Sequence, residues 1–255
     1  MQDHQSRPVT IVCGATGSVG GELVARLVAC GHHVVAAGRD RERLEQLALE
    51  HELETCEIDA SQAGSIEQCI AETASRFGHL TGVANCIGSI LLKPAHRTTD
   101  EEFMEVLQTN LCSSFAVIRG AARAMRKTGG SAVLVSSAAA RLGITGHEAI
   151  AAAKAGVEGL ARAAAATYAG SGIRVNAVAP GLVRSGMSEK IWSNPGAARQ
   201  SEQMHALGRL GEPADVASMI AWLLDPENSW VTGQVIGVDG GLGTVLARPG
   251  QGSAT

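Results

Sequence analysis

Hydrophobic and polar positions follow two alternating periods along this chain. Short, almost wholly apolar runs, typical of strands buried on both faces, alternate with longer segments whose apolar residues recur every three or four positions. "PVTIVCG" is the first strand-like run, and "GSVGGELVARLVACG", with Val19, Leu23 and Leu27 on one face, is the first helical segment. The pattern predicts strands over 8–14, 32–38, 54–59, 80–86, 130–137, 173–180 and 232–241. It predicts helices over 17–31, 40–51, 65–78, 100–125, 147–170 and 212–225.

Strict alternation of strands and helices is typical of an α/β protein whose parallel sheet is covered by helices on both faces. We therefore expect one doubly wound domain with a seven-stranded parallel sheet over residues 1–255. Neither an internal repeat nor a linker rich in Pro, Gly or Ser divides the chain. The segments 1–7 and 244–255 are polar or glycine-rich and are expected to be flexible tails.

The segment 181–212 breaks the alternation. It fits no strand and contains only short helical patches, around 189–192 and 200–205. It follows the expected strand 173–180, and ligands of doubly wound sheets bind at the carboxyl ends of the strands. Long irregular inserts in compact folds are usually functional. We interpret 181–212 as a substrate lid whose apolar residues and lack of a charged clamp beyond Arg184 and Arg199 favour a small neutral substrate.

The amino-acid composition argues against nucleic acid, membranes and metal ions as binding partners. With 45% hydrophobic residues, 18% charged residues and a net charge of −4, the chain has no basic footprint for nucleic acid or an anionic membrane. No apolar run approaches the ~20 residues of a membrane span. The six cysteines form no C-x-x-C pair, so we expect neither a metal site nor a disulfide framework. The first residues contain no apolar signal segment, and a cytoplasmic location is expected.

A glycine-rich turn follows the first expected strand. In "CGATGSVGG", Gly14, Gly17 and Gly20 lie between a strand and a helix. Glycines there let the backbone approach a pyrophosphate, which the helix N-terminus then binds with its free N–H groups. The turn therefore predicts a dinucleotide site.

The end of the second expected strand indicates which dinucleotide. An acidic residue there would bind a ribose 2′-hydroxyl, whereas an arginine suits a 2′-phosphate. "VVAAGRD" has Gly38 at that position, followed by Arg39. A guanidinium matches phosphate in a bidentate way, so NADP(H) is favoured over NAD(H). Asp40 is the alternative, because its carboxylate could still reach a ribose.

Several further motifs resemble the short-chain dehydrogenase/reductase family over residues 8–243. They are "GATGSVG", "EIDAS", "ANCIG", "TNL", "VLVSSAA", "AAAKAGVEGL", "IRVNAVAPG", "GRLGEPADVA" and "VTGQVIGVDGG". The resemblance implies a Rossmann fold, an oxidoreductase activity, a small-molecule substrate and a homotetramer built on the helices around 101–126 and 148–170 and on the C-terminal strand. Ser18 stands where the family has the middle glycine of its motif.

The resemblance also assigns roles to single positions. Asp59 would contact adenine, Asn85 and Gly88 would bound the turn after the fourth strand, and Lys154 would bind the nicotinamide ribose. Asn110 would hold a relay water and Ser137 would orient the substrate. The implied cofactor-binding residues are Gly14, Thr16, Gly17, Ser18, Val19, Gly20, Arg39, Asp59, Asn85, Gly88, Lys154, Pro180, Gly181, Val183 and Ser185.

One position departs from the family's chemistry. The catalytic tyrosine should stand four residues before Lys154, where this chain has Ile150. Losing a positioned general acid costs roughly 10²–10⁴ in rate. Tyr168, the only tyrosine, lies ~21 Å along the same expected helix from Lys154 and cannot substitute.

Other proton sources remain open: His147, Glu148 and Ser136 lie nearby, and Lys154 could donate through a water. Three functions are therefore weighed: an NADP(H)-dependent oxidoreductase acting on a carbonyl, an alcohol or an activated double bond; a catalytically silent NADP(H)-binding subunit or sensor; and a non-redox isomerase or dehydratase. Ile150 would form part of the pocket floor in the first.

Overall fold

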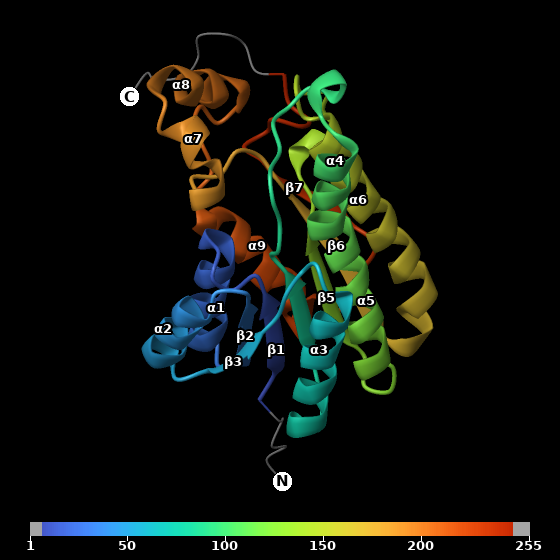
Figure 1. Ribbon diagram of the computed structural model, residues 1–255. Helices are drawn as coiled ribbons and strands as arrows, with labels where there is room; N and C mark the ends of the chain where they lie inside the picture. The colour runs from blue at the N-terminus through green and yellow to red at the C-terminus, as the bar shows by residue number, and fades with distance from the viewer. Residues whose placement is uncertain (1–6, 247–255) are drawn as a thin grey trace.

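Within the part of the chain that the structure describes, seven parallel strands form one twisted sheet in the order β3-β2-β1-β4-β5-β6-β7 (Figure 1). This computed structural model describes residues 7–246, apart from the side chain of residue 63. The strands are β1 (Val9–Cys13), β2 (His33–Gly38), β3 (Glu54–Glu57), β4 (Gly82–Asn85), β5 (Gly130–Val135), β6 (Ile173–Pro180) and β7 (Val235–Val238). Each lies within one of the predicted strand segments, so the predicted parallel sheet is confirmed.

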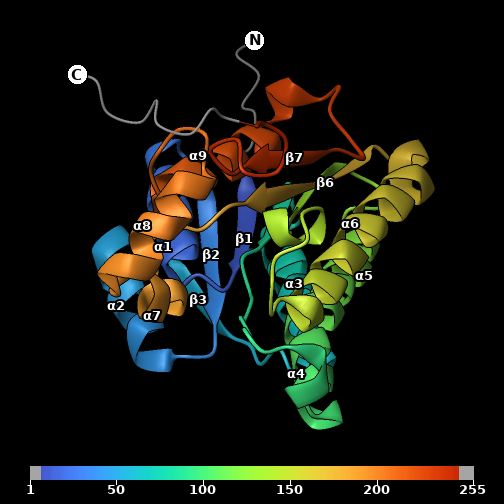
Figure 2. The same ribbon diagram turned by 90° about the horizontal axis from the view of Figure 1, so that it is seen from above.

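Helices cover both faces of the sheet (Figures 1 and 2). On one face α1 packs on α9, with Leu23 and Ile220 in a shared core; on the other, α3, α5 and α6 pack on a core that includes Ile70 and Val117. The helices are α1 (Ser18–Ala29), α2 (Arg41–His51), α3 (Ala63–Phe77), α4 (Asp100–Leu107), α5 (Ser113–Ala124), α6 (Glu148–Tyr168), α7 (Glu189–Trp192), α8 (Pro195–Met204) and α9 (Pro213–Leu224). Single 3₁₀ turns lie at Ala95–Arg97, Ala138–Ala140, Ala169–Ser171, Gly186–Ser188 and Pro226–Asn228.

The strand order reverses between β1 and β4. The chain leaves the carboxyl end of β1 toward α1 and β2 on one side, whereas β4 begins the other half of the sheet. Such a switch point opens a crevice at the carboxyl edge of the sheet. Residues 16 and 17 of the glycine-rich turn after β1 and the turn 86–88 after β4 line this crevice.

The helix predicted over 100–125 is interrupted. A π-helical turn, Gln108–Cys112, separates α4 from α5. At its centre the Asn110 side chain donates to the Val106 carbonyl, and the hydroxyls of Ser113 and Ser114 donate to the carbonyls four residues before them. These side chains compete with the backbone for helical acceptors, which explains why the apolar period missed the break. Such turns often mark functional sites.

The predicted lid segment folds into α7 and α8 beyond the carboxyl ends of the strands (Figure 1). Asn194 caps α8, which therefore starts earlier than the patch expected at 200–205. A bridge between Val183 and Gly211 closes the base of the segment, with Gly211 N–H donating to the Leu182 carbonyl at 2.9 Å. The tails predicted to be flexible lie outside the described residues, apart from 7 and 244–246. No helix within the described part of the chain is both long and apolar enough to cross a membrane.

Candidate functional site

The glycine-rich turn brings backbone to the sheet edge in a way that side chains would block. Gly14 has φ +79°, and a Cβ there would lie 2.8 Å from the backbone carbon of Cys86. A Cβ on Gly20 would lie 2.1 Å from the Gly14 carbonyl oxygen. Gly17 caps α1 without a side-chain hydrogen bond, so the first N–H groups of that helix keep their capacity for an anion. The turn therefore fits a dinucleotide pyrophosphate.

A cavity of about 370 Å³ runs from this turn to the start of the lid segment. It brings together most of the residues expected at a dinucleotide site. Those lining it are Thr16, Gly17, Ser18, Val19, Gly20, Gly88, Asn110, Ser137, Ile150, Lys154, Pro180, Gly181, Val183 and Ser185. We call this cavity the cofactor cleft. Gly14, Arg39, Asp59, Asn85 and His147 do not line it.

Lys154 is buried in the cleft. Its side chain is only 6% exposed, and its ammonium donates to the Val135 carbonyl at 2.8 Å. Burial lowers the pKa of Lys154 to about 8, because the charged form loses hydration. An ammonium in this state holds a proton at neutral pH and releases it more easily than an exposed lysine does.

Asn110 joins the π-turn to the loop that follows β4. Its amide oxygen accepts from Ser89 N–H at 3.2 Å, and its amide nitrogen donates to the Ser89 hydroxyl at 3.0 Å. A Cβ on Gly88 would lie 3.2 Å from the Asn110 oxygen and 3.6 Å from the Lys154 nitrogen. The absence of a side chain at Gly88 thus leaves both polar groups open to the cleft.

Ser137 lies in the loop after β5 and caps the 3₁₀ turn Ala138–Ala140. Its hydroxyl accepts from Ala139 N–H at 3.2 Å. Its neighbour Ser136 points the other way, donating to the Lys154 carbonyl and to Glu158 at 3.2 Å each. Arg141 also donates to Glu158, at 3.1 Å. This buried cluster holds the Ser137 turn against α6. Ser136 is therefore engaged in packing the loop.

Ile150 lies one turn before Lys154 on α6 and is 5% exposed. It packs with Val106, Ala149 and Ala153 while lining the cofactor cleft. Its side chain thus contributes an apolar surface where the resemblance predicts a phenol. Tyr168 ends the same helix and packs against the main core instead.

Arg39 and Asp59 follow the adjacent strands β2 and β3. The pKa of Asp59 lies below its ordinary value, chiefly because Ser61 N–H donates to its carboxylate, and the charge of Arg39 lowers it further. Asp40 caps α2 through Arg43 N–H at 3.1 Å and pairs with the Arg43 guanidinium at 3.5 Å. Its carboxylate is therefore committed to the helix. Arg43 itself lines the cleft next to Thr16.

Asn85 has a structural position below the cleft. Its amide nitrogen donates to the hydroxyls of Ser113 and Ser114, at 3.3 and 3.0 Å, and its oxygen accepts from Ile87 N–H. These bonds attach the turn after β4 to the start of α5. Asn85 shapes the cleft from beneath.

A second cavity of about 410 Å³ adjoins the cofactor cleft under α7 and α8. The two share Ile90, Ser137, Ile150, Pro180, Gly181 and Leu182. Most other lining residues are apolar, among them Ile144, Ile191 and Met204. His147 lines this second cavity, and its Nδ1 donates to the Thr145 carbonyl at 2.9 Å, which leaves Nε2 as the ring atom available to a ligand. Among the described residues, no three His, Cys, Asp or Glu side chains are placed to hold a metal ion.

Comparison with known proteins agrees with this geometry. The family model described as enoyl-(acyl carrier protein) reductase matches residues 14–243. The 3-oxoacyl-[acyl-carrier-protein] reductase FabG of Thermotoga maritima is 33% identical over 241 residues, which are 92% of this chain and 97% of that protein. This chain belongs to the short-chain dehydrogenase/reductase family. It is thus a member of a family of oxidoreductases.

Solved short-chain dehydrogenase/reductase structures have the same fold. One from Mycobacterium ulcerans superposes with a TM-score of 0.90 at 30% identity, covering 94% of this chain and 91% of its own. A point variant of actinorhodin polyketide ketoreductase with NADPH has a TM-score of 0.87 at 28% identity, covering 94% of this chain and 98% of its own. The predicted family and fold are confirmed.

Several residues of the cleft were missed from the sequence, among them Arg43 and Cys86. Arg43 lies in the first turn of α2, where the helical period marks it only as a polar surface position. Cys86 follows β4 and lines the cleft, and burial raises the pKa of its thiol to about 12, so it is neutral. The fixed spacing between a strand end and the following helix turn is the signal that could have pointed to Arg43.

Proposed function

We propose that this protein is an NADP(H)-dependent oxidoreductase acting on a small, neutral carbonyl compound, alcohol or activated double bond. The observation that carries the proposal is the shared wall of the two cavities. Ser137 and Ile150 line both, so a nicotinamide in the cofactor cleft and a substrate under the lid would meet beside them. When bound, the reduced nicotinamide would supply a hydride.

Basic residues at the mouth of the cleft support NADP(H) over NAD(H). Arg43 lines the cleft, Arg39 lies at the end of the adjacent strand, and Gly38 has no side chain to fill the space between. The carboxylate of Asp40 is bonded to α2 rather than available to a ribose. Two guanidinium groups suit a 2′-phosphate better than a hydroxyl.

The second cavity suits a substrate with little charge. Its walls are mainly aliphatic, and Arg184, which the sequence offered as a clamp, pairs with Glu202 and Glu212 at 3.3 and 3.5 Å. Lys190 is the exposed basic residue that lines its rim. Ser137 would donate a hydrogen bond to a substrate oxygen at the boundary with the cofactor cleft.

Lys154 is our proposed proton source in place of the missing phenol. Its ammonium lies in the cleft with a pKa of about 8, so it carries a proton at neutral pH. As the substrate carbon becomes reduced, its oxygen takes a proton from Lys154, and solvent returns one to the amine. His147 is the alternative donor from the far wall of the second cavity. A conjugated enone or an iminium would need less help from either.

A substrate screen tests this function. NADPH oxidation should be followed with a panel of ketones, enones and imines, with Lys154→Met as the comparison. We expect at least one class to be reduced, and Lys154→Met to lose roughly 10²-fold or more of that rate. NADPH binding without turnover of any class by the parent protein would contradict the proposal.

That outcome would favour the second candidate, a catalytically silent NADP(H)-binding protein. The observation in its favour is Ile150, which is buried among Val106, Ala149 and Ala153 and has no proton to give. A cofactor could bind such a cleft without reacting. Under this alternative, Lys154→Met would change NADPH affinity and nothing else.

A further inference from the structure

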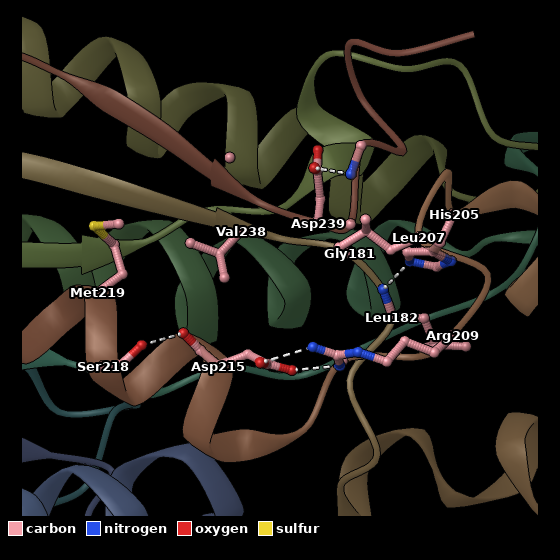
Figure 3. Close-up of a pocket in the computed structure, with 14 residues that line it drawn as sticks. Gly181, Leu182, His205, Leu207, Arg209, Asp215, Ser218, Met219, Val238 and Asp239 are labelled. Carbon is pink, nitrogen blue, oxygen red and sulfur yellow. Dashed lines mark hydrogen bonds and ion pairs between the residues drawn. The ribbon is translucent and has the colours of Figure 1, made fainter. Parts of the chain in front are cut away.

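His205 joins the lid segment to the loop after β6. It follows α8 directly and is 4% exposed. Its Nε2 accepts from Leu182 N–H at 3.1 Å (Figure 3), and its Nδ1 donates to the Ser201 carbonyl at 2.6 Å. One ring thus bridges the last turn of α8 and the chain segment that leaves the sheet.

The two bonds require a neutral ring. Nδ1 must carry the proton, because its partner is a carbonyl, and Nε2 must lack one, because its partner is an N–H. A second proton would turn Nε2 into a donor facing the Leu182 donor. The bridge therefore exists only with uncharged His205.

The loop that His205 contacts is the shared floor of the site. Gly181 and Leu182 line the cofactor cleft, the second cavity, and a third cavity of about 440 Å³ behind them (Figure 3). Contact is close: a Cβ on Gly181 would lie 2.5 Å from the His205 Nε2. Glycine at 181 is what lets the imidazole reach the loop. A shift of the ring would move the floor of both working cavities.

We infer that His205 is a positioning residue that latches the end of α8 onto the Gly181–Leu182 loop, closing the second cavity when its ring is neutral and releasing it in acid. The latch itself depends only on the fold. Its effect on substrate binding rests on the proposed function.

The surroundings of the ring decide whether another group could account for such a pH response. Asp239 accepts from Gly241 N–H at 2.9 Å, and Arg209 pairs with Asp215 at 2.7 Å (Figure 3). Asp239 also accepts from Gly243 N–H, at 2.9 Å. The charged or titratable residues that line the two cavities on either side of His205 are Arg209, Asp215, Asp239, His147 and Lys190. The described hydrogen bonds of the His205 imidazole are to Leu182 N–H and the Ser201 carbonyl, and none involves these five residues.

Hydrogen–deuterium exchange tests the latch without any substrate. Protection of the Leu182 amide, corrected for the intrinsic exchange rate, should be measured in the full chain at about pH 8 and about pH 5. In the parent we expect protection to fall at least tenfold at the lower pH, while the amides of β6 stay protected. His205→Ala should give low protection at both pH values. His205→Gln, whose amide oxygen can accept without titrating, should keep most protection at both.

His51→Gln is the matched control, because it removes a histidine from α2, away from the lid. It should keep the pH response of the parent. Equal protection of Leu182 at both pH values in the parent, or unchanged protection in His205→Ala, would overturn the latch. If the parent reduces diacetyl, KM should rise at the lower pH in the parent and not in His205→Gln. Absence of turnover would count against the proposed function and leave the exchange result to decide the latch.

Discussion

At the scale of single residues, Ile150 is the position on which the chemistry depends. The groups around it, Lys154, Ser137 and Asn110, line one cleft. Ile150 lies among them, buried and apolar, and touches both cavities. The site thus has a proton-bearing lysine and a hydrogen-bonding serine without the phenol between them.

Restoring that phenol should restore reductase chemistry. We expect Ile150→Tyr to gain at least tenfold in diacetyl reduction, a modest part of the roughly 10²–10⁴ that a positioned acid contributes. The cavities on both sides leave room for the larger ring, and Lys154 one helical turn away would lower the pKa of the phenol. Ile150→Phe is the matched control for size. An equal gain in both variants, or a slower Ile150→Tyr, would show that the pocket is built around isoleucine and a different donor.

Cofactor choice also belongs to single residues. Arg39→Ala and Arg43→Ala should each weaken NADPH binding by about tenfold or more, since each removes a charge-assisted hydrogen bond of roughly 1.5–3 kcal/mol, while NADH binding should hardly change. Calorimetry measures both affinities. Arg41→Ala is the control, because Arg41 is on the same helix as Arg43 but is not among the residues that line the cleft. Equal affinity of the parent for NADPH and NADH would refute the assignment.

At the scale of elements, hydrophobic periodicity predicted the strands and main helices, because most of them bury a regular set of apolar side chains. Strands such as β1 are buried throughout, and α1 shows a regular apolar face. The break at Gln108–Cys112 could not be found this way, since it arises from Asn110, Ser113 and Ser114 bonding to backbone. The predicted residues that line the cleft, such as Lys154, were identified from the spacing of motifs. Arg43, and the cap formed by Asp40, depend on how α2 starts, which a motif does not specify.

The π-turn should depend on the Asn110 amide. Asn110→Ala would leave the part-buried Ser89 N–H and the buried Val106 carbonyl without their partner, and we expect a loss of about 2 kcal/mol in the free energy of unfolding. Urea denaturation measures this loss. Gln108→Ala is the control on the same turn, because its amide makes only longer contacts, at 3.3 and 3.4 Å, with the loop after β3. A similar loss in both variants would mean that the turn does not depend on Asn110.

At the scale of the whole molecule, apolar side chains remain exposed on α5 and just before β7, two regions that the family resemblance places at subunit interfaces. Phe115 on α5 is 50% exposed, and Trp230, before β7, is 99% exposed. Burying such side chains between copies of the chain would remove apolar surface from water and so stabilise an oligomer. The homotetramer therefore stays our prediction for the assembled protein.

Light scattering should give a mass about four times the 26.2 kDa of one chain at micromolar concentration. Phe115→Asp should lower that mass, because it places a charge in the expected contact. Leu49→Asp on α2, where Leu49 is 84% exposed, is the control and should leave the mass unchanged. A stable monomeric parent would exclude the assembly.

Isotope transfer is the measurement that shows whether the cofactor cleft and the second cavity together carry out hydride transfer. NADPH carrying deuterium at the reactive carbon of the nicotinamide should be incubated with the protein and the carbonyl compound that the screen identifies, and the product examined by mass spectrometry. We predict one deuterium in each product molecule formed by the parent. With Lys154→Met, we predict that the amount of labelled product falls by roughly 10²-fold or more. Product without deuterium would contradict hydride transfer from NADPH to the substrate. Equal labelling in both proteins would contradict the role of Lys154 as the proton source.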